Sequence, residues 1–333
     1  MLTGPPHASG PVARPPATGS PPDGARHPDA DTAATADRLA AGMVYGLTAE
    51  AVTWPKPGLV TAVDTGSHHD MDVYTLLRSA AALQPGFRAA ALFGLERGSA
   101  ARVARDFTRL RAAGQRAERA MLAATGGVNT HRGSVFLGML LCCAAGVEHA
   151  AGRPPEPDGI CRTARDLSRD ALRADLAAPV TGRTSTGLRA HAHHGLSGVR
   201  GEVLRGLPSL TGHGLPALRA ALGAGRPLRE AVADTVLALM AVVEDTTVLN
   251  RKFTPDRLHR TRERAAAARA AGGTATRRGR QRIARLSRYL EHERISPGGS
   301  ADLAAMAVAL HTWHTRWQDT PAQKGPLRAH APA

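Results

Sequence analysis

Aromatic residues and cysteines are scarce in this sequence. Phe, Tyr and Trp make up 3% of the 333 residues, and the β-branched side chains that fill strands are also few, so the composition favours helices. The three cysteines, Cys142, Cys143 and Cys161, have the spacing of neither a disulfide framework nor a zinc site. Their pattern indicates a protein of a reducing compartment, and the adjacent pair is expected in the core of an apolar helix.

Long apolar segments are missing as well. No run of about 18 apolar residues is available to cross a bilayer. The first residues, MLTGPPHASG, lack the apolar core of a secretory signal. The sequence therefore predicts a soluble, cytoplasmic protein without a membrane partner.

Acidic residues are fewer than basic ones, which gives a formal net charge of +15. The excess is concentrated in residues 251–294, where 14 Arg or Lys stand against 4 Asp or Glu. Such a basic helical stretch can bind nucleic acid, attract polyphosphate or form a solvated face. Because few aromatic residues are interleaved with the arginines and no nucleic-acid-binding module is recognisable, a nucleic-acid partner is not expected.

The hydrophobic pattern predicts an all-α protein with one bundle-like domain of about ten helices. The domain is expected over residues 34–318, between a disordered Pro/Gly/Ala-rich tail at 1–33 and a flexible C-terminal tail at 319–333. The expected helices are 37–54, 74–83, 87–95, 101–124, 134–150, 160–174, 227–250, 255–271, 276–292 and 300–317.

Five polar, glycine-bearing segments interrupt these apolar helices: 55–72, 125–133, 198–202, 244–251 and 296–302. Connecting loops need Gly, Pro, Asn and Ser, but they do not need Lys, His, Asp, Arg and Glu beside the glycines. Glycine permits close backbone approach, and free amides at helix starts suit phosphate oxygens. Carboxylates nearby suit a magnesium ion carried by a nucleotide. The segments therefore indicate a nucleotide site.

The usual nucleotide motifs are absent, since neither GxxxxGK[ST] nor a strand-linked GxGxxG occurs. The cluster of His191, His193 and His194 resembles a metal-binding tract. No Cys or carboxylate accompanies it at ligand spacing, so a polar helix end is the favoured interpretation.

Taken in order, PKPGLV, GSHHDMD, TGGVNTHRG, GVRGE, EDTTVLNR and SPGGSAD resemble segments of the triphosphoribosyl-dephospho-CoA synthase family, from Leu39 to about Leu310. The resemblance implies an all-α enzyme that takes ATP and 3′-dephospho-CoA, releases adenine and leaves a triphosphoribosyl group on the 2′-hydroxyl of the acceptor. The product would be the prosthetic-group precursor for the acyl carrier subunit of malonate decarboxylase or citrate lyase. VDTGSHHDMD and SPGGSAD look closer to the malonate decarboxylase branch.

The resemblance also implies roles for individual residues. His68, Asp70 and Glu202 would be catalytic, and Asp70, Asp72 and Asp245 would bind Mg²⁺. Contacts to the nucleotide would come from Lys56, Gly58, Asn129, His131, Arg132, Arg200, Arg251, Ser296, Gly298 and Gly299.

Other interpretations of the acidic residues stay open at this point. Asp70 and Asp72 can cap the helix that follows them. Glu202 can be the base for the 2′-hydroxyl or the salt-bridge partner of Arg200. Asp245 is expected at the end of an apolar helix, where a carboxylate opposes the helix dipole and so suggests a nearby cation.

The sequence departs from the family pattern in two segments. Thr61 stands where many citrate lyase relatives carry Asp, and DTTVLNRKF replaces DTNVLHRGG. The altered loop and the basic stretch favour two alternatives to the enzyme: a non-catalytic helical nucleotide- or RNA-binding protein, and an adenine-releasing transferase with another acceptor.

Overall fold

The computed structural model describes residues 28–179, 186–249 and 255–318. Within these ranges the chain forms thirteen α-helices and no strand, which confirms the all-α prediction. The α-helices are α1 Ala30–Val52, α2 Val73–Arg97, α3 Ala100–Arg105, α4 Phe107–Ala124, α5 Arg132–Ala150, α6 Pro157–Ala177, α7 Thr186–His194, α8 Gly198–Leu204, α9 Leu215–Gly223, α10 Leu228–Met240, α11 Pro255–Ala270, α12 Arg277–His292 and α13 Gly298–Gln318. A π-turn, η1, spans Leu210–Gly214, and a 3₁₀ turn, η2, spans Thr246–Leu249.

The first helix begins earlier than its apolar pattern predicts. Asp29 caps α1, because its carboxylate accepts a hydrogen bond of 2.8 Å from the backbone N–H of Thr32. Residues 30–33 therefore belong to the helix, so the predicted boundary of the N-terminal tail is too late. The rest of that tail up to residue 27, and the predicted tail at 319–333, lie outside the described residues.

Several helix boundaries differ from the expectations. The two helices predicted on either side of Pro85 are one continuous α2, because its packing against α1, α4 and α5 outweighs the missing proline donor. The segment predicted as helix 101–124 is divided at Asp106 into α3 and α4. Residues 198–202 form helix α8 rather than a turn, and α9 was not predicted. The merger in α2 and the division at Asp106 cancel in number, so the three helices that were not predicted, α7, α8 and α9, account for thirteen helices instead of ten.

The core is centred on α2 and α5, which make the most extensive helix–helix contact. Glycines let the two backbones approach closely. A Cβ atom on Gly94 would collide with the carbonyl oxygen of Cys143, and one on Gly146 would collide with that of Ala91. Cys142 and Cys143 are fully buried here, as expected, and burial raises the pKa of both thiols. They are therefore packing residues.

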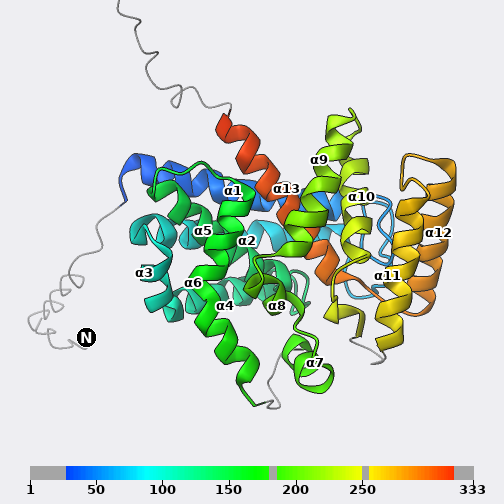
Figure 1. Ribbon diagram of the computed structural model, residues 1–333, viewed down its shortest axis with the longest axis horizontal. Helices are drawn as coiled ribbons and strands as arrows, with labels where there is room; N and C mark the ends of the chain where they lie inside the picture. Colours follow the sequence, from blue (N-terminus) through cyan, green and yellow to red (C-terminus); the bar gives the residue numbers. More distant parts are fainter. Residues whose placement is uncertain (1–27, 180–185, 250–254, 319–333) are drawn as a thin grey trace, which may run out of the picture.

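Helices α1 and α13, from opposite ends of the described chain, pack along each other beside this core (Figure 1). Trp313 of α13 donates a hydrogen bond of 3.1 Å from its indole N–H to the carbonyl oxygen of Leu39 on α1. A Cβ atom on Gly46 would collide with the carbonyl oxygen of Ala305. This contact ties the loop after α1 to the start of α13, and both segments contribute to the site.

Helix α5 is long and apolar enough to cross a membrane by length and composition. Its most apolar window is 78% buried inside the protein. That burial is the pattern of a core helix, since α1, α2, α4, α6 and α13 all contact it.

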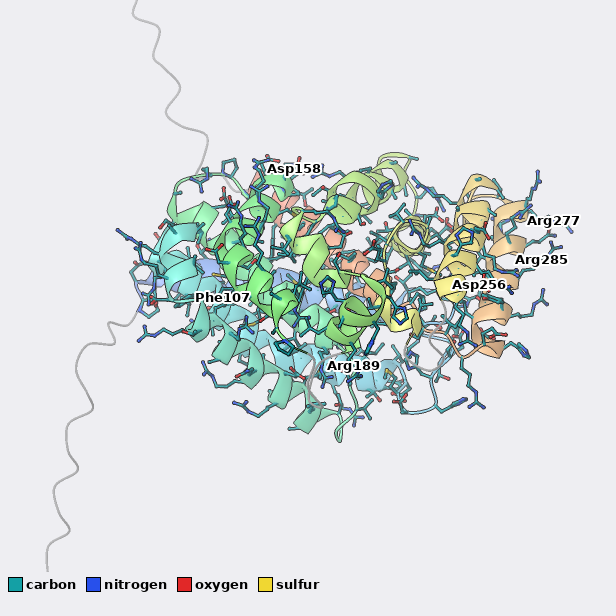
Figure 2. All side chains as sticks on the ribbon, turned by 60° about the horizontal axis from the view of Figure 1, so that its bottom comes forward. Phe107, Asp158, Arg189, Asp256, Arg277 and Arg285 are labelled. Atoms are coloured by element: carbon teal, nitrogen blue, oxygen red, sulfur yellow. The ribbon has the colours of Figure 1, made fainter. Side chains whose placement is uncertain are left out.

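The described part of the basic stretch, from residue 255 on, folds as the α11–α12 pair at one end of the molecule (Figure 1). Ile283, Leu286 and Leu290 bury one face of α12. Arg277 and Arg285 project from its exposed side, away from the rest of the fold (Figure 2). In the described part of the stretch, most arginines therefore belong to a solvated helix face.

Candidate functional site

One cavity of about 880 Å³ receives residues from all five polar segments. Its volume is within the usual range for a small-molecule site. The predicted site residues that line it are Lys56, His68, Asn129, His131, Arg132, Arg200, Glu202, Asp245, Ser296, Gly298 and Gly299. The fold thus brings together segments that are up to about 240 residues apart in the sequence.

A buried ion pair lies on the cavity wall. The ammonium nitrogen of Lys56 is 2.6 Å from Glu50 Oε1, and both side chains are almost inaccessible to solvent. Burial lowers the pKa of Lys56, and the charge of Glu50 opposes that shift. Glu50 lies inside α1 and was not predicted as a site residue. Lys56 lines the cavity as expected, but its charge is balanced by a carboxylate.

His131 precedes α5 and is buried beside this pair. Burial and the positive charge of Lys56 lower its pKa to about 4, so the imidazole is neutral at pH 7. Its Nδ1 lies 2.7 Å from the hydroxyl of Ser79, which also accepts a hydrogen bond of 2.7 Å from Thr130. Neighbouring hydroxyls therefore fix the orientation of a neutral imidazole in the cavity wall.

Asp302, on the first turns of α13, is a further carboxylate in the cavity. The hydroxyl of Ser134 on α5 donates a hydrogen bond to its Oδ1. Burial, with added repulsion from Asp245 and Glu50, raises the pKa of Asp302 to about 7, although the hydrogen bonds from Ser134 oppose the shift. This carboxyl group therefore changes its charge near neutral pH.

Asp245 does not lie at the end of an apolar helix, because α10 already ends at Met240. It lies instead at the N-terminus of α13, where the helix dipole favours a carboxylate. Its Oδ1 accepts hydrogen bonds from Gly299 N and Thr247, and its Oδ2 accepts from Ser300 N and Oγ at 2.8 and 2.9 Å. The prediction that Asp245 lies at the C-terminal end of an apolar helix, which suggested a nearby cation, is therefore wrong.

The same contacts change the expectation for the glycines of SPGGSAD. The N–H of Gly298 donates to the hydroxyl of Thr247 at 2.8 Å, and the N–H of Gly299 donates to Asp245 at 3.1 Å. A Cβ atom on Gly299 would be 2.8 Å from Asp245 Oδ1. The glycines line the cavity, but their backbone N–H groups already donate to the side chains that cap the start of α13. They are therefore not free to bind phosphate.

The other predicted carboxylates do not converge on a magnesium site. Asp72 caps α2 and accepts hydrogen bonds of 2.8 and 2.7 Å from the N–H and hydroxyl of Thr75. Asp70 is more than half exposed, does not line the cavity, and lies 3.5 Å from His68 Nδ1. In the described part of the chain, no three His, Cys, Asp or Glu side chains are grouped to hold a metal ion. Asp70, Asp72 and Asp245 thus do not fit a preformed Mg²⁺ site.

Gly58 also lies off the cavity lining. Its φ of +72° is in the left-handed region, and a Cβ atom there would be 2.6 Å from the carbonyl oxygen of Ile295. It therefore permits close packing of the loop after α1 on the α12–α13 connection. In the same connection, Ser296 lies 2.7 Å from His68 Nε2, which fixes that imidazole at the cavity.

Arg200 and Glu202 do not pair with each other. Glu202 accepts hydrogen bonds of 3.1 and 2.8 Å from the N–H and hydroxyl of Ser209, and Arg205 lies 3.4 Å from it. Arg200 lies 3.4 Å from Asp175 and covers the ring of Phe136. Glu202 thus joins α8 to the following turn, and the Arg200–Glu202 salt bridge, one of the two alternatives left open by the sequence, does not form.

Arginines from several elements surround the cavity: Arg111, Arg132, Arg189, Arg200 and Arg294. Arg111 and Arg132 pair with Asp175 and Glu118 at 2.9 and 2.6 Å. Arg189 and Arg294 are exposed, and Figure 2 shows Arg189 well away from the α12 arginines. Arg251 lies outside the described residues. The cavity therefore has a basic rim around a buried polar wall.

Sequence reasoning missed Glu50, Ser134, Arg111, Arg189 and Asp302. Asp302 is the last residue of the SPGGSAD segment. The segment was recognised from the sequence, but Asp302 was not predicted as a site residue. Glu50 and Arg111 lie inside ordinary helical patterns that carry no local signal. The tract of His191, His193 and His194 forms the last turn of α7, as favoured from the sequence, and does not line the cavity.

Comparisons with known proteins identify the family of this chain. A sequence-family model described as ATP:dephospho-CoA triphosphoribosyl transferase matches residues 36–321. A probable 2-(5′′-triphosphoribosyl)-3′-dephosphocoenzyme-A synthase of Albidiferax ferrireducens is 37% identical over 77% of this chain and 84% of its own length. The synthase of Pectobacterium atrosepticum is 36% identical over 82% of this chain and 88% of its own length. No solved structure matches the chain. The chain therefore belongs to the ATP:dephospho-CoA triphosphoribosyl transferase family of enzymes.

Proposed function

We propose that this protein transfers the 5-triphosphoribosyl group of ATP to the 2′-hydroxyl of 3′-dephospho-CoA and releases adenine. Its relatives in Albidiferax ferrireducens and Pectobacterium atrosepticum are named as synthases, the first a probable one, of the corresponding product. The observation that carries the proposal is that the five polar segments meet in one cavity, which has arginines at its rim. A nucleotide triphosphate and a polar acceptor can be held together in such a space.

The reaction makes demands that this cavity can meet. Loss of adenine from the anomeric carbon leaves positive charge on the ribose, and the triphosphate carries negative charge throughout. Rim arginines supply charge-assisted hydrogen bonds to phosphate oxygens. The neutral imidazole of His131 can donate or accept a hydrogen bond without adding charge near the ribose. Mg²⁺ would enter with ATP on its phosphate oxygens rather than in a preformed site.

One end of the cavity is apolar. Phe107, Leu110, Met139, Leu140 and Leu172, from α4, α5 and α6, form this apolar end. Arg111 lies beside it, with its guanidinium over the ring of Phe107. We assign the apolar end to the pantetheine arm of the acceptor, because that arm is long, uncharged and partly apolar.

Gly114 on α4 tests this assignment. Gly114→Leu places a side chain in the apolar end, and we expect the KM for dephospho-CoA to rise about tenfold, equivalent to roughly 1.4 kcal/mol of binding. The KM for ATP should change little. Gly114→Ala is the matched control, since its Cβ atom would make only ordinary contact with Met139 at 3.8 Å. A rise confined to the KM for ATP would place adenine there instead.

The reaction itself is tested by incubating the protein with ATP and 3′-dephospho-CoA and following both by chromatography and mass spectrometry. We expect one adenine for each triphosphoribosylated acceptor. Adenine release that is independent of dephospho-CoA would favour a transferase with another acceptor. ATP binding without adenine release would favour a non-catalytic nucleotide-binding protein.

The later fate of the product is part of the proposal. We infer that it becomes the prosthetic group of an acyl carrier subunit, of malonate decarboxylase or of citrate lyase, and that the enzyme acts in the cytoplasm. The VDTGSHHDMD and SPGGSAD segments favour malonate decarboxylase. Reconstitution of each apo-carrier with the purified product and a transfer enzyme would distinguish the two.

A further inference from the structure

Among the acidic side chains that line the cavity, Asp302 and Glu244 form no ion pair in the described part of the chain, and Glu244 accepts only a hydrogen bond of 3.4 Å from Ser197. Glu50 pairs with Lys56, and Glu118 pairs with Arg132. The remaining paired or capping carboxylates are Asp175, Glu202 and Asp245. Within the described residues, Asp302 forms no ion pair with Lys, Arg or His, and its identified hydrogen-bond donor is Ser134. Its carboxylate is therefore not neutralised by a cation.

The position of Asp302 is fixed by two helix starts. Asp245 and Thr247 cap α13, which sets the first turn that carries Asp302. On the other side, Gly133 of α5 leaves room for the carboxylate, because a Cβ atom there would collide with Asp302 Oδ2. Asp302 is thus held in a half-buried position that lines the cavity.

Charged and titratable groups on the neighbouring elements set its proton affinity. Glu50 on α1 and Asp245 before η2 raise the pKa of Asp302 by repulsion, in addition to burial. Lys56, after α1, is balanced by Glu50, and His131, before α5, is neutral at pH 7. A carboxylate that titrates near the working pH is suited to take and return a proton.

We propose that Asp302 is the general base that removes the proton from the 2′-hydroxyl of the acceptor, an inference that rests on the proposed function. The O2′–H bond breaks and the proton moves to the Asp302 carboxylate. The O2′–C1′′ bond forms as the C1′′–N9 bond breaks, and the electron pair of that bond leaves with adenine. Adenine takes up one proton, and Asp302 returns its proton to water, so no net proton is released.

Asp302→Asn tests the base directly. We expect kcat to fall about 10²–10⁴-fold while the dissociation constant for ATP stays within a few-fold of the wild-type value. The wild-type rate should decline below pH about 7 as Asp302 becomes protonated, and this acid limb should disappear in Asp302→Asn. Glu244→Gln is compared in parallel, because Glu244 is another cavity carboxylate without a described ion pair.

Ser134→Ala provides a second, independent measurement. Hydrogen bonds from Ser134 lower the pKa of Asp302, so loss of the hydroxyl should move the acid limb of kcat to higher pH. A purely structural role of Ser134 would reduce the rate without moving the limb. This measurement keeps the test decisive even if Asp302→Asn folds poorly.

Thermal unfolding monitors the fold of each variant and also tests in which direction the stability of the protein changes with pH. Between the unfolded pKa near 4 and the folded pKa of about 7, folded wild-type protein binds more protons than unfolded protein, so its stability falls as pH rises. The melting temperature of wild type relative to Asp302→Asn should therefore decrease from pH 5 to pH 8.

The outcomes separate the base assignment from the proposed function. If wild type forms product but Asp302→Asn keeps its rate and acid limb, or if Glu244→Gln alone loses them, Asp302 is not the base. If wild type releases no adenine from ATP in the presence of dephospho-CoA, the proposed function itself is wrong.

Discussion

Lys56→Met is expected to lower the free energy of unfolding by about 3–5 kcal/mol, because it leaves Glu50 as a buried charge without its partner. Glu50→Leu should cost a similar amount by leaving the ammonium group unpaired. The double variant, Glu50→Leu with Lys56→Met, should recover much of the loss, since an apolar pair of similar volume can replace a buried ion pair. Urea unfolding of the four proteins completes the double-mutant cycle.

The Glu50–Lys56 ion pair also affects the pKa of His131. The charge of Lys56 contributes to the lowered pKa of His131, so Lys56→Met should raise that pKa from about 4 toward its ordinary value of 6.5. Burial is the larger cause and persists, so the shift should be partial. Histidine titration by NMR measures it. Single variants as stable as wild type, with an unchanged His131 pKa, would contradict the buried pair.

Gly94→Ala is expected to destabilise the protein by about 3 kcal/mol or more. The new Cβ atom would collide with the carbonyl oxygen of Cys143, which is backbone and cannot rotate away, so α2 and α5 must move apart. Helix propensity alone predicts the opposite sign, a gain of roughly 1 kcal/mol on replacing a glycine within a helix.

Gly114→Ala is the matched control for this effect. It also replaces a glycine inside a helix, but its Cβ atom would make only ordinary contact, 3.8 Å from Met139 Cγ. We expect stabilisation of about 0.5–1 kcal/mol. Urea unfolding of both variants should give opposite signs. Equal changes in both would show that the close approach of α2 and α5 is not what constrains Gly94.

Local sequence signals predicted helices well where a cap and an apolar face agree. Thr276 accepts a hydrogen bond of 2.9 Å from Gly279 N and opens α12 where the pattern predicts it. The prediction failed at Pro85, because the packing of α2 on its neighbours is invisible in a local window. It also placed the end of α10 too late, since residues 241–249 turn toward the start of α13.

The five polar segments were recognisable because they concentrate charged residues beside glycines, and that pattern does not depend on where each helix ends. Their meeting in one cavity is a property of the fold. The hydrogen-bond or ion-pair partner of each side chain is also a property of the fold. Asp72 caps its own helix, as its spacing allows, whereas Asp245 caps a helix that starts more than 50 residues later.

The sequence by itself determined the helical class, the family and the segments that form the site, because these depend on composition, periodicity and short-range spacing. Only the tertiary structure decided what the carboxylates do. Glu202 and Asp245 became structural acceptors because hydrogen-bond donors surround them. Asp302 titrates near neutral pH because folding buries it and brings Glu50 and Asp245 close, and repulsion between distant positions in the chain exists only after the helices pack.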